Sequence, residues 1–187
     1  MGSSYQTVLV AGERAQVRRG LWWGLRPAVV LPVGERRWAV VPRGRHGYAE
    51  TAGLARRLSL GAGVWTARFE VFDSDFLTAE IYSGGQARHE YHSDQGYVIE
   101  DFDEDGEELL VDRLGRVHRD FGDVVHGPYG ADPSAFAPLG LGEIDLAALG
   151  AVLSGEARAE DRHHELLHLL NLTPGPLQMT YAEALRA

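Results

Sequence analysis

The sequence predicts an α+β protein in which an antiparallel sheet forms the centre and a helical extension closes the chain. Residues 64–92 contain three runs rich in aromatic and β-branched residues, which is the composition of a three-strand meander. Asp73-Ser74-Asp75 and Ser83-Gly84-Gly85 separate the runs, and Gly-Gly supplies the positive φ angles that a two-residue hairpin turn needs. Segments of helical period stand before and after the meander, so both flanking parts of the chain can supply helices that pack on the sheet.

The first meander run predicts a sheet with one buried face and one solvated face. Apolar and polar residues alternate along the run, and alternate residues of a strand point to opposite faces. The apolar set is Trp65, Ala67, Phe69 and Val71, and the polar set is Thr66, Arg68 and Glu70. We therefore expect the rest of the chain to pack on the apolar face.

Four elements are predicted before the meander from hydrophobic period and turn signals. They are a strand (Gln6 to Val10), a helix (Gly12 to Gly24), a hairpin (Pro27 to Val33 with Arg37 to Val41) and a second helix (Tyr48 to Leu60). Together with the first meander strand they give the order β-α-β-β-α-β. This is the order of the ferredoxin-like fold, an antiparallel sheet with two helices on one face. The other two meander strands extend that sheet as a C-terminal hairpin pair.

The C-terminal part is predicted as a connector followed by helices. Three prolines make residues 127–142 an irregular connector. Asp145 suits the N-cap of a helix from Leu146 to Leu153, and a last helix is expected from Ala159 to about Asn171. The predicted organisation is a sheet domain, 1–126, with a connector and helical extension, 127–187, packed on the same domain.

The composition predicts a bacterial, cytoplasmic protein. All 18 basic residues are arginine and glycine numbers 23, a bias typical of a GC-rich bacterial genome. The chain has no cysteine, so it can hold neither a disulfide nor a thiolate metal site. The first residues lack the pattern of a signal peptide, and no run approaches the roughly 20 apolar residues of a membrane span. We expect neither a membrane nor a nucleic-acid partner.

The net charge of −9 conceals an asymmetry between the two parts of the chain. Residues 1–60 hold ten arginines and three acidic residues, whereas residues 61–187 hold eight arginines and 24 acidic residues. Eight of the thirteen residues from Glu100 to Asp112 are acidic, which predicts a solvated loop with a short strand near Leu109 to Val111. This loop is the predicted surface for a basic protein partner. Its predicted contact residues are Asp101, Asp103, Glu104, Asp105, Glu107 and Glu108.

A candidate zinc site lies in the last predicted helix, where His164-Glu165-Leu166-Leu167-His168 has the pattern His-Glu-x-x-His. Histidines spaced i, i+4 share one helix face and can share a zinc ion, while Glu165 can act as general base. In these residues the segment resembles the zincin metallopeptidases. The longer metzincin pattern is absent, and Glu183 is the predicted third ligand. The two histidines lie opposite the leucines on a helical wheel, and we favour an exposed amphipathic helix without metal.

A candidate calcium loop overlaps the acidic segment. Residues 101–106 place oxygen ligands at positions 1, 3 and 5 and a glycine at position 6, as at the start of an EF-hand loop, and Asp112 falls at position 12. Glu108 occupies a position that is apolar in EF-hands, and residues 95–100 lack a helical pattern. The candidate ligands are Asp101, Asp103 and Asp105, and a plain acidic loop is the favoured alternative.

Two functions are consistent with these patterns. The first is a small non-enzymatic binding protein of the immunity or regulatory type, which needs no cofactor and uses its acidic surface to engage a basic protein. The second is a zinc-dependent hydrolase that uses the helix of His164 and His168. The pattern favours the first.

Overall fold

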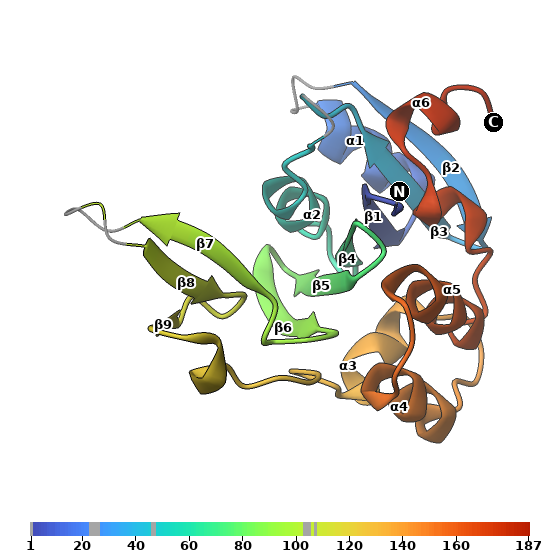
Figure 1. The fold of residues 1–187 in the computed structure, drawn as a ribbon. Coiled ribbons are helices and arrows are strands. Elements are labelled where there is room, and N and C mark those ends of the chain that lie inside the picture. The colour runs from blue at the N-terminus through green and yellow to red at the C-terminus, as the bar shows by residue number, and fades with distance from the viewer. Residues whose placement is uncertain (1, 23–26, 46–47, 103–105, 107) are drawn as a thin grey trace.

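A computed structural model describes residues 2–22, 27–45, 48–102, 106 and 108–187 (Figure 1). Short 3₁₀ turns accompany the helices and strands. The strands are β1 (Tyr5–Ala11), β2 (Ala28–Gly34), β3 (Arg37–Pro42), β4 (Trp65–Phe72), β5 (Phe76–Ser83), β6 (Gln86–His92), β7 (Val98–Phe102), β8 (Glu108–Asp112) and β9 (Val117–His118). The helices are α1 (Arg14–Trp22), α2 (Ala52–Leu58), α3 (Pro133–Phe136), α4 (Leu146–Ser154), α5 (Ala159–Leu169) and α6 (Tyr181–Ala184).

The centre of the molecule is a six-stranded sheet in the order β2-β3-β1-β4-β5-β6. Every neighbouring pair in it is antiparallel. Pro32 lies on the edge strand β2 and Pro42 ends β3, both positions where a missing N–H donor is tolerated. The predicted α+β class with an antiparallel sheet is therefore confirmed.

The meander forms β4, β5 and β6, and both of its turns use positive φ angles. Gly84 and Gly85 have φ angles of 62° and 75°, which is the conformation that the Gly-Gly pair predicts. At the other turn, Asp73 and Ser74 adopt φ angles of 47° and 64°. Aspartate tolerates this region better than most residues. Asp73 Oδ1 also accepts a hydrogen bond from Gly2 N at 3.1 Å, which joins the turn to the backbone that precedes β1.

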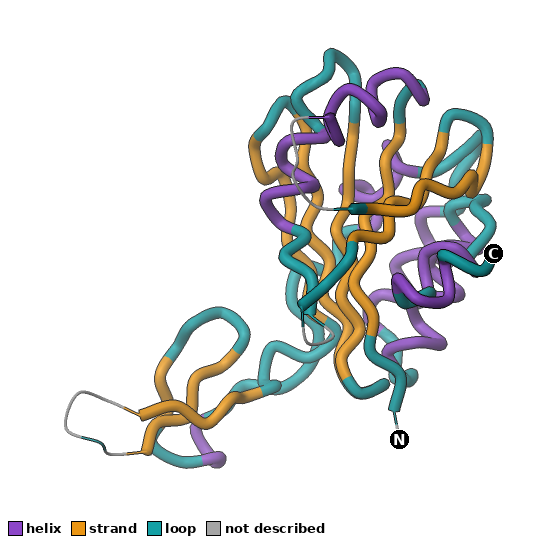
Figure 2. Tube along the Cα trace, turned by 90° about the horizontal axis from the view of Figure 1, so that it is seen from above, coloured by secondary structure: helices purple, strands orange, loops and turns teal. Residues whose placement is uncertain are grey.

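Helices cover both faces of the main sheet, so the prediction of a solvated face is wrong (Figure 2). The helices α1 and α2 lie on the face that carries Thr66 and Glu70, and both of these residues are buried there. Thr66 Oγ1 donates to the carbonyl of Ala55 in α2 at 2.9 Å, which satisfies the polar side chain inside the protein. The opposite face, with Ala67 and Phe69, is covered by the C-terminal helices.

Two predicted segments need correction. The second helix begins at Ala52 rather than Tyr48, because Tyr48 pairs with Arg45 in a β-bridge. The connector 127–142 contains α3 and a 3₁₀ turn, and it contributes two fully buried side chains, Phe136 and Leu139, to the core. By contrast, Asp145 caps α4 as predicted, with its Oδ1 accepting from Ala147 N at 3.0 Å.

A second, three-stranded sheet in the order β7-β8-β9 projects from the rest of the molecule (Figures 1 and 2). We call residues 98–125 the arm and the remainder of the chain the body. The predicted solvated loop at 100–112 is thus wrong in part, because Val98–Phe102 and Glu108–Asp112 form the two strands of an antiparallel hairpin. Within the described residues, no helix is both long and apolar enough to cross a membrane.

Candidate functional site

The arm is held together by a buried carboxylate at its base. Asp112 Oδ1 accepts from the backbone N of Leu114 at 3.0 Å and of Arg116 at 2.9 Å. Its Oδ2 accepts from Arg116 Nε at 2.6 Å and faces His118 Nε2 at 2.8 Å. Burial opposes the charged form, but the hydrogen bonds from His118, Arg116 and Leu114 lower the pKa of Asp112 to about 2. This carboxylate therefore fixes the turn between β8 and β9 and is not available to a calcium ion.

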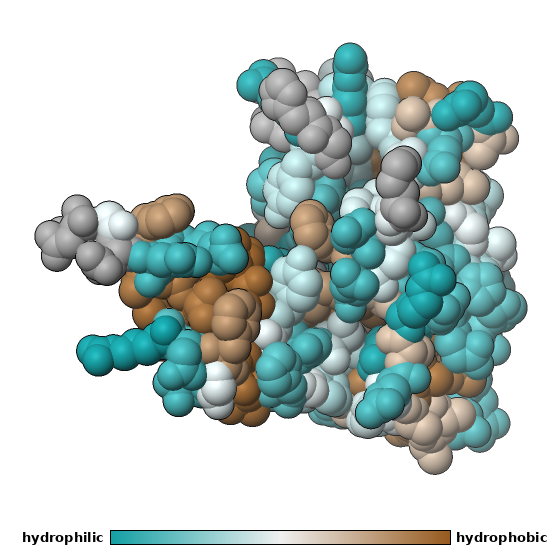
Figure 3. All heavy atoms as spheres, viewed as in Figure 1, coloured by the Kyte–Doolittle hydropathy of each residue, from teal (hydrophilic) through white to brown (hydrophobic). Residues whose placement is uncertain are grey.

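The rest of the arm exposes large apolar side chains beside acidic ones. Only Leu110 and Val124 are buried apolar residues within its described part. Figure 3 shows apolar surface on the arm where it joins the body. The exposed apolar residues of the arm are Ile99, Phe102, Val117, Phe121 and Val125. A small sheet region that exposes several large apolar side chains is typical of a surface that contacts another molecule.

Two of the predicted partner-binding residues are described, and both are exposed on the hairpin of the arm. Asp101 on β7 pairs with Leu109, and Glu108 on β8 pairs with Phe102, so the two acidic residues are diagonal neighbours across the hairpin. Asp103, Glu104, Asp105 and Glu107 lie outside the described residues. Asp101 is the one described residue of the candidate calcium set, and it lies in strand β7. Its Oδ1 accepts from Phe102 N at 2.9 Å.

A cavity of about 390 Å³ lies where the arm joins the body, and we call it the cleft. Four of its eight lining residues are aromatic, and they come from distant parts of the sequence. Phe76 stacks on Tyr97 with ring centroids 5.1 Å apart, and Tyr97 meets Phe72 edge to face at 6.2 Å. The lining residues are Tyr48, Glu70, Phe72, Phe76, Tyr97, Val98, Ile99 and Arg113.

A buried charge network stands behind the cleft. Arg68 lies between two carboxylates, donating to Glu70 Oε2 at 3.2 Å and to Glu80, which also accepts from the Tyr82 hydroxyl. Burial opposes ionisation of Arg68 and Glu80, yet the hydrogen bonds within the network raise the pKa of Arg68 and lower the pKa of Glu80. Two carboxylates therefore share one guanidinium, and the network carries surplus negative charge.

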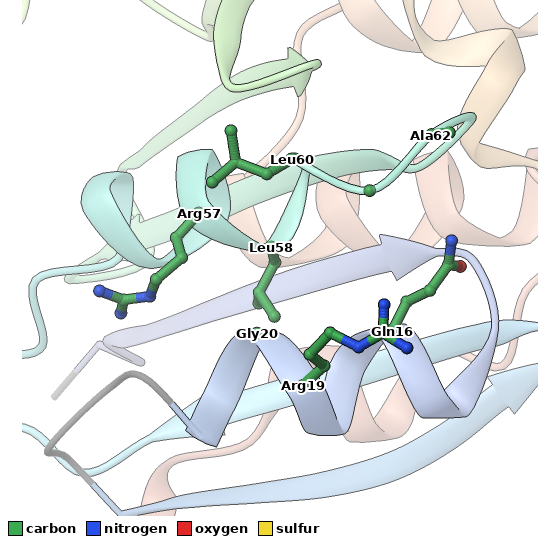
Figure 4. Close-up of a pocket in the computed structure, with 8 residues that line it drawn as sticks. Gln16, Arg19, Gly20, Arg57, Leu58, Leu60 and Ala62 are labelled. Carbon is green, nitrogen blue, oxygen red and sulfur yellow. The ribbon is translucent and has the colours of Figure 1, made fainter.

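A second cavity, of about 590 Å³, lies between α1 and α2 (Figure 4). Arg19 and Arg57 line it, but in Figure 4 their guanidinium groups point in different directions rather than toward one centre. Leu58 lies against Gly20, where a side chain of any size would meet it. The cavity thus has no convergent polar groups to orient a ligand, unlike the cleft.

The His-Glu-x-x-His segment lies on the exposed face of α5. His164, Glu165 and His168 are exposed, while the leucines between them are buried, as the helical wheel predicts. The rings of His164 and His168 are 4.9 Å apart, and His164 Nδ1 faces Gln178 Oε1 at 2.8 Å. The i, i+4 spacing thus brings the two imidazoles together.

The predicted third zinc ligand has a different role. Glu183 Oε2 accepts from Thr180 N at 2.8 Å and from Thr180 Oγ1 at 2.7 Å, forming a capping box at the start of α6. These hydrogen bonds lower the pKa of Glu183. Among the described residues, no three metal-ligating side chains come close enough to share an ion.

Comparison with known proteins gives no counterpart. No family model, no curated protein and no solved structure matches the chain. The function must therefore be argued from the residues of the cleft and the arm.

Two buried polar residues beside the predicted histidine pair escaped the sequence analysis. His163 is fully buried between Tyr5 and Phe69, with Nδ1 facing the Tyr5 hydroxyl at 2.9 Å. Burial, with a smaller contribution from the charge of His164, lowers the pKa of His163 to about 3. Arg162 donates to the carbonyl of Leu153 at 2.9 Å inside the same core. The one available signal was position, since 162 and 163 precede leucines of the buried helix face by four residues.

Proposed function

We propose that this protein is a non-enzymatic binding protein that engages a basic protein partner through its arm. The observation that carries the proposal is the exposure of acidic and large apolar side chains together on the arm. Acidic groups attract and orient a basic partner, while apolar groups supply the area that is removed from water on contact. A bacterial, cytoplasmic setting belongs to the same proposal and is supported by the arginine-only, cysteine-free composition.

The charge of the arm supports a basic partner over a second copy of the chain. Strand β7 has one neighbour, β8, so its outer edge offers backbone groups to another strand. Glu100 and Asp101 are exposed on this strand. Two copies paired along β7 would bring these acids together, and like charges directly opposite each other destabilise strand pairs. A basic strand or loop would be attracted instead.

The test is a charge-neutral arm compared with an equally neutralised body. In the arm variant, Asp101, Asp103, Glu104, Asp105, Glu107 and Glu108 become Asn or Gln. In the control variant, the exposed body residues Glu35, Asp75, Glu143, Glu156, Asp161 and Glu165 become Asn or Gln. Partners captured from the native cells by the unmodified protein are identified, and the affinity of the purified partner is then measured for each variant.

We expect the captured partner to be basic and its affinity to fall by at least about tenfold for the arm variant, because several attractive charges are lost together. The control variant should bind within about twofold of the unmodified protein. Added salt should weaken binding to the unmodified protein and hardly affect the arm variant, since screening acts only on the charges that remain. Equal affinity of the two variants would refute the proposal.

A zinc-dependent hydrolase is the second candidate, favoured by the closeness of the two exposed imidazoles on α5. Two histidines alone leave a zinc ion short of the three protein ligands of hydrolytic sites. Protein purified without nickel and then dialysed decides the matter: stoichiometric zinc that is lost in His164→Ala would support this candidate. If the unmodified protein holds no more zinc than the His168→Ala variant, this result counts against the hydrolase.

We also infer that residues 5–72 follow the ferredoxin-like plan. In support, β3 lies between β1 and β2 while β1 lies between β3 and β4, and all these pairs are antiparallel. Helices α1 and α2 pack together on one face of these strands. On this plan β5, β6 and the arm are additions at one edge, which is where a new binding surface can be built without disturbing the core.

A further inference from the structure

The cleft has the size and composition of a site for one side chain or small ligand. Its volume of about 390 Å³ falls within the ~300–1,000 Å³ typical of ligand pockets. Two of its aromatic rings are accessible, since Tyr48 is 55% and Phe72 is 48% exposed. Phe76 is fully enclosed by its stacking on Tyr97 and on His92, whose ring centroid lies 5.7 Å away. The wall is therefore rigid on one side and open on the other.

The polar group in this aromatic wall is a carboxylate. The side chain of Glu70 is only 6% exposed, and it shares the guanidinium of Arg68 with Glu80. A carboxylate held away from water with a shared counter-ion gains from a further cation at close range. The faces of Tyr and Phe rings also attract cations through their quadrupoles. Both features of the cleft favour a positively charged ligand.

The chain already places a guanidinium in the cleft. Arg113 lies with its guanidinium carbon 4.8 Å from the ring centroid of Phe76. It makes no ion pair or side-chain hydrogen bond with another described residue, although the Glu70 carboxylate lines the same cleft. Arg113 belongs to the turn that Asp112 holds between β8 and β9, so it is attached to the arm rather than to the sheet. It occupies the cleft as an internal ligand of the same chemistry.

We propose that the cleft binds an arginine side chain of the basic partner, with Arg113 as the internal group that the partner's guanidinium displaces. This inference rests on the proposed binding function and names what the partner must present. The incoming guanidinium stacks on Phe72 and Tyr48 and pairs with Glu70. Arginine suits this arrangement better than lysine, because its planar group stacks on aromatic faces and is more weakly hydrated than an ammonium.

The position of the cleft agrees with the proposed surface of the arm. Val98 and Ile99, the first residues of β7, line the cleft, and the exposed acids Glu100 and Asp101 follow them directly. An extended basic segment lying along the outer edge of β7 would therefore meet acidic residues first and the cleft at its end. The arginine in the cleft would then fix the register of that segment.

The test uses acetyl-arginine methylamide as the probe, followed by NMR shifts of the Phe72 and Tyr97 rings. The matched probes are acetyl-lysine methylamide, in which the lysine amine is free, and acetyl-citrulline methylamide, which has nearly the shape of arginine but no charge. We expect saturable shifts with the arginine probe, about threefold weaker binding of the lysine probe, and no saturable shift with citrulline. Absence of saturation with arginine, or equal affinity for citrulline, overturns the proposal.

Three variants locate the site. Phe72→Ala should weaken the arginine probe by about threefold through loss of a stacking face. Glu70→Gln should weaken it by about tenfold through loss of a charged hydrogen bond. Phe121→Ala, an exposed aromatic change elsewhere on the arm, should leave it unchanged. If Glu70→Gln does not fold because the Arg68 network is disturbed, Phe72→Ala decides alone, and unchanged affinity in that variant overturns the proposal.

The variant Arg113→Gln tests whether the internal guanidinium competes with the probe. Removing the internal guanidinium should tighten the arginine probe by about threefold, because a competitor and a like charge are both removed. Weaker binding in Arg113→Gln, together with saturable binding of acetate, would mean that the cleft takes anions and would overturn the proposal. The charge-neutral arm variant should lose the partner but still bind the arginine probe. If this variant loses the partner and does not bind the probe either, the proposed function stands and only the arginine site is rejected.

Discussion

The body and the arm are both built from antiparallel strands, but they bury very different side chains. In the body the strands β4 and β5 are covered on both faces, and large residues such as Phe69, Phe76 and Tyr91 are fully enclosed. In the described part of the arm, Leu110 and Val124 are the buried apolar residues, and a polar group, Asp112, holds the turn. A sheet with so little apolar burial depends on its attachment to a stable body. Its exposed side chains are thereby free for contact.

The largest expected difference between the two regions follows from removing one aromatic ring. Phe69→Ala should lower the free energy of unfolding by about 3–5 kcal/mol, because it opens a cavity among fully buried side chains. The matched change in the arm, Phe121→Ala, removes a ring that is 65% exposed and should change it by less than about 0.5 kcal/mol. Urea unfolding followed by circular dichroism measures both. Similar losses in the two variants would erase the contrast between body and arm.

Acid should destabilise the body before it loosens the arm. Burial lowers the pKa of His163 in the body to about 3, below the ordinary 6.5. The unfolded chain therefore binds a proton that the folded chain does not, and stability is lost as the pH falls from about 6.5 toward 3. The loss between pH 7 and pH 5 should be about 2 kcal/mol from this residue. His163→Phe should flatten the dependence over that range, whereas His164→Phe, at an exposed site, should keep it.

The smallest effect should be confined to the arm. Asp112→Asn replaces an oxygen that accepts from Arg116 and faces His118 with a group that donates, and it should weaken the turn by about 1–2 kcal/mol. Amide hydrogen exchange should quicken in β8 and β9 while β1 and β4 keep their protection. Asp123→Asn, which neutralises an exposed carboxylate in the same arm, should change neither the stability of the turn nor the exchange rates. Faster exchange throughout β1 would show that the arm and body unfold together.

Acid should weaken the hydrogen bonds of Asp112 in the arm at a lower pH than it destabilises the body. The folded pKa of Asp112, about 2, lies below its ordinary 3.8, so its contribution is complete above about pH 4 and is lost as the pH falls toward 2. Hydrogen exchange in β8 should therefore become faster below pH 4 after correction for the intrinsic rate. The body should already have lost stability by then, through His163.

Local signals predicted the six strands of the main sheet and four of the six described helices, α1, α2, α4 and α5. The Gly84-Gly85 pair, the Asp145 cap and the alternation of Ala67 and Phe69 act within a few residues of sequence, and the structure agrees with each of them. The polar members of the same alternation misled, because Thr66 and Glu70 resemble a solvated face. Their hydrogen-bond partners lie on other elements, and a sequence pattern of period two does not identify them. In the acidic segment 100–112, the high charge likewise predicted a solvated loop, although its strands pair in a β-hairpin.

By itself, the sequence determined which segments alternate, turn and cap, because these depend on side chains and backbone angles of neighbouring residues. It also placed His164 and His168 on one exposed helix face, since the 3.6-residue period alone requires this. Only the tertiary structure decided that both sheet faces are covered, and that Tyr48, Glu70 and Arg113 meet in one cleft. These three residues are 22 and 43 positions apart in sequence, and they come together only where the base of the arm meets β4 and β5. That meeting depends on packing between elements, which no local pattern records.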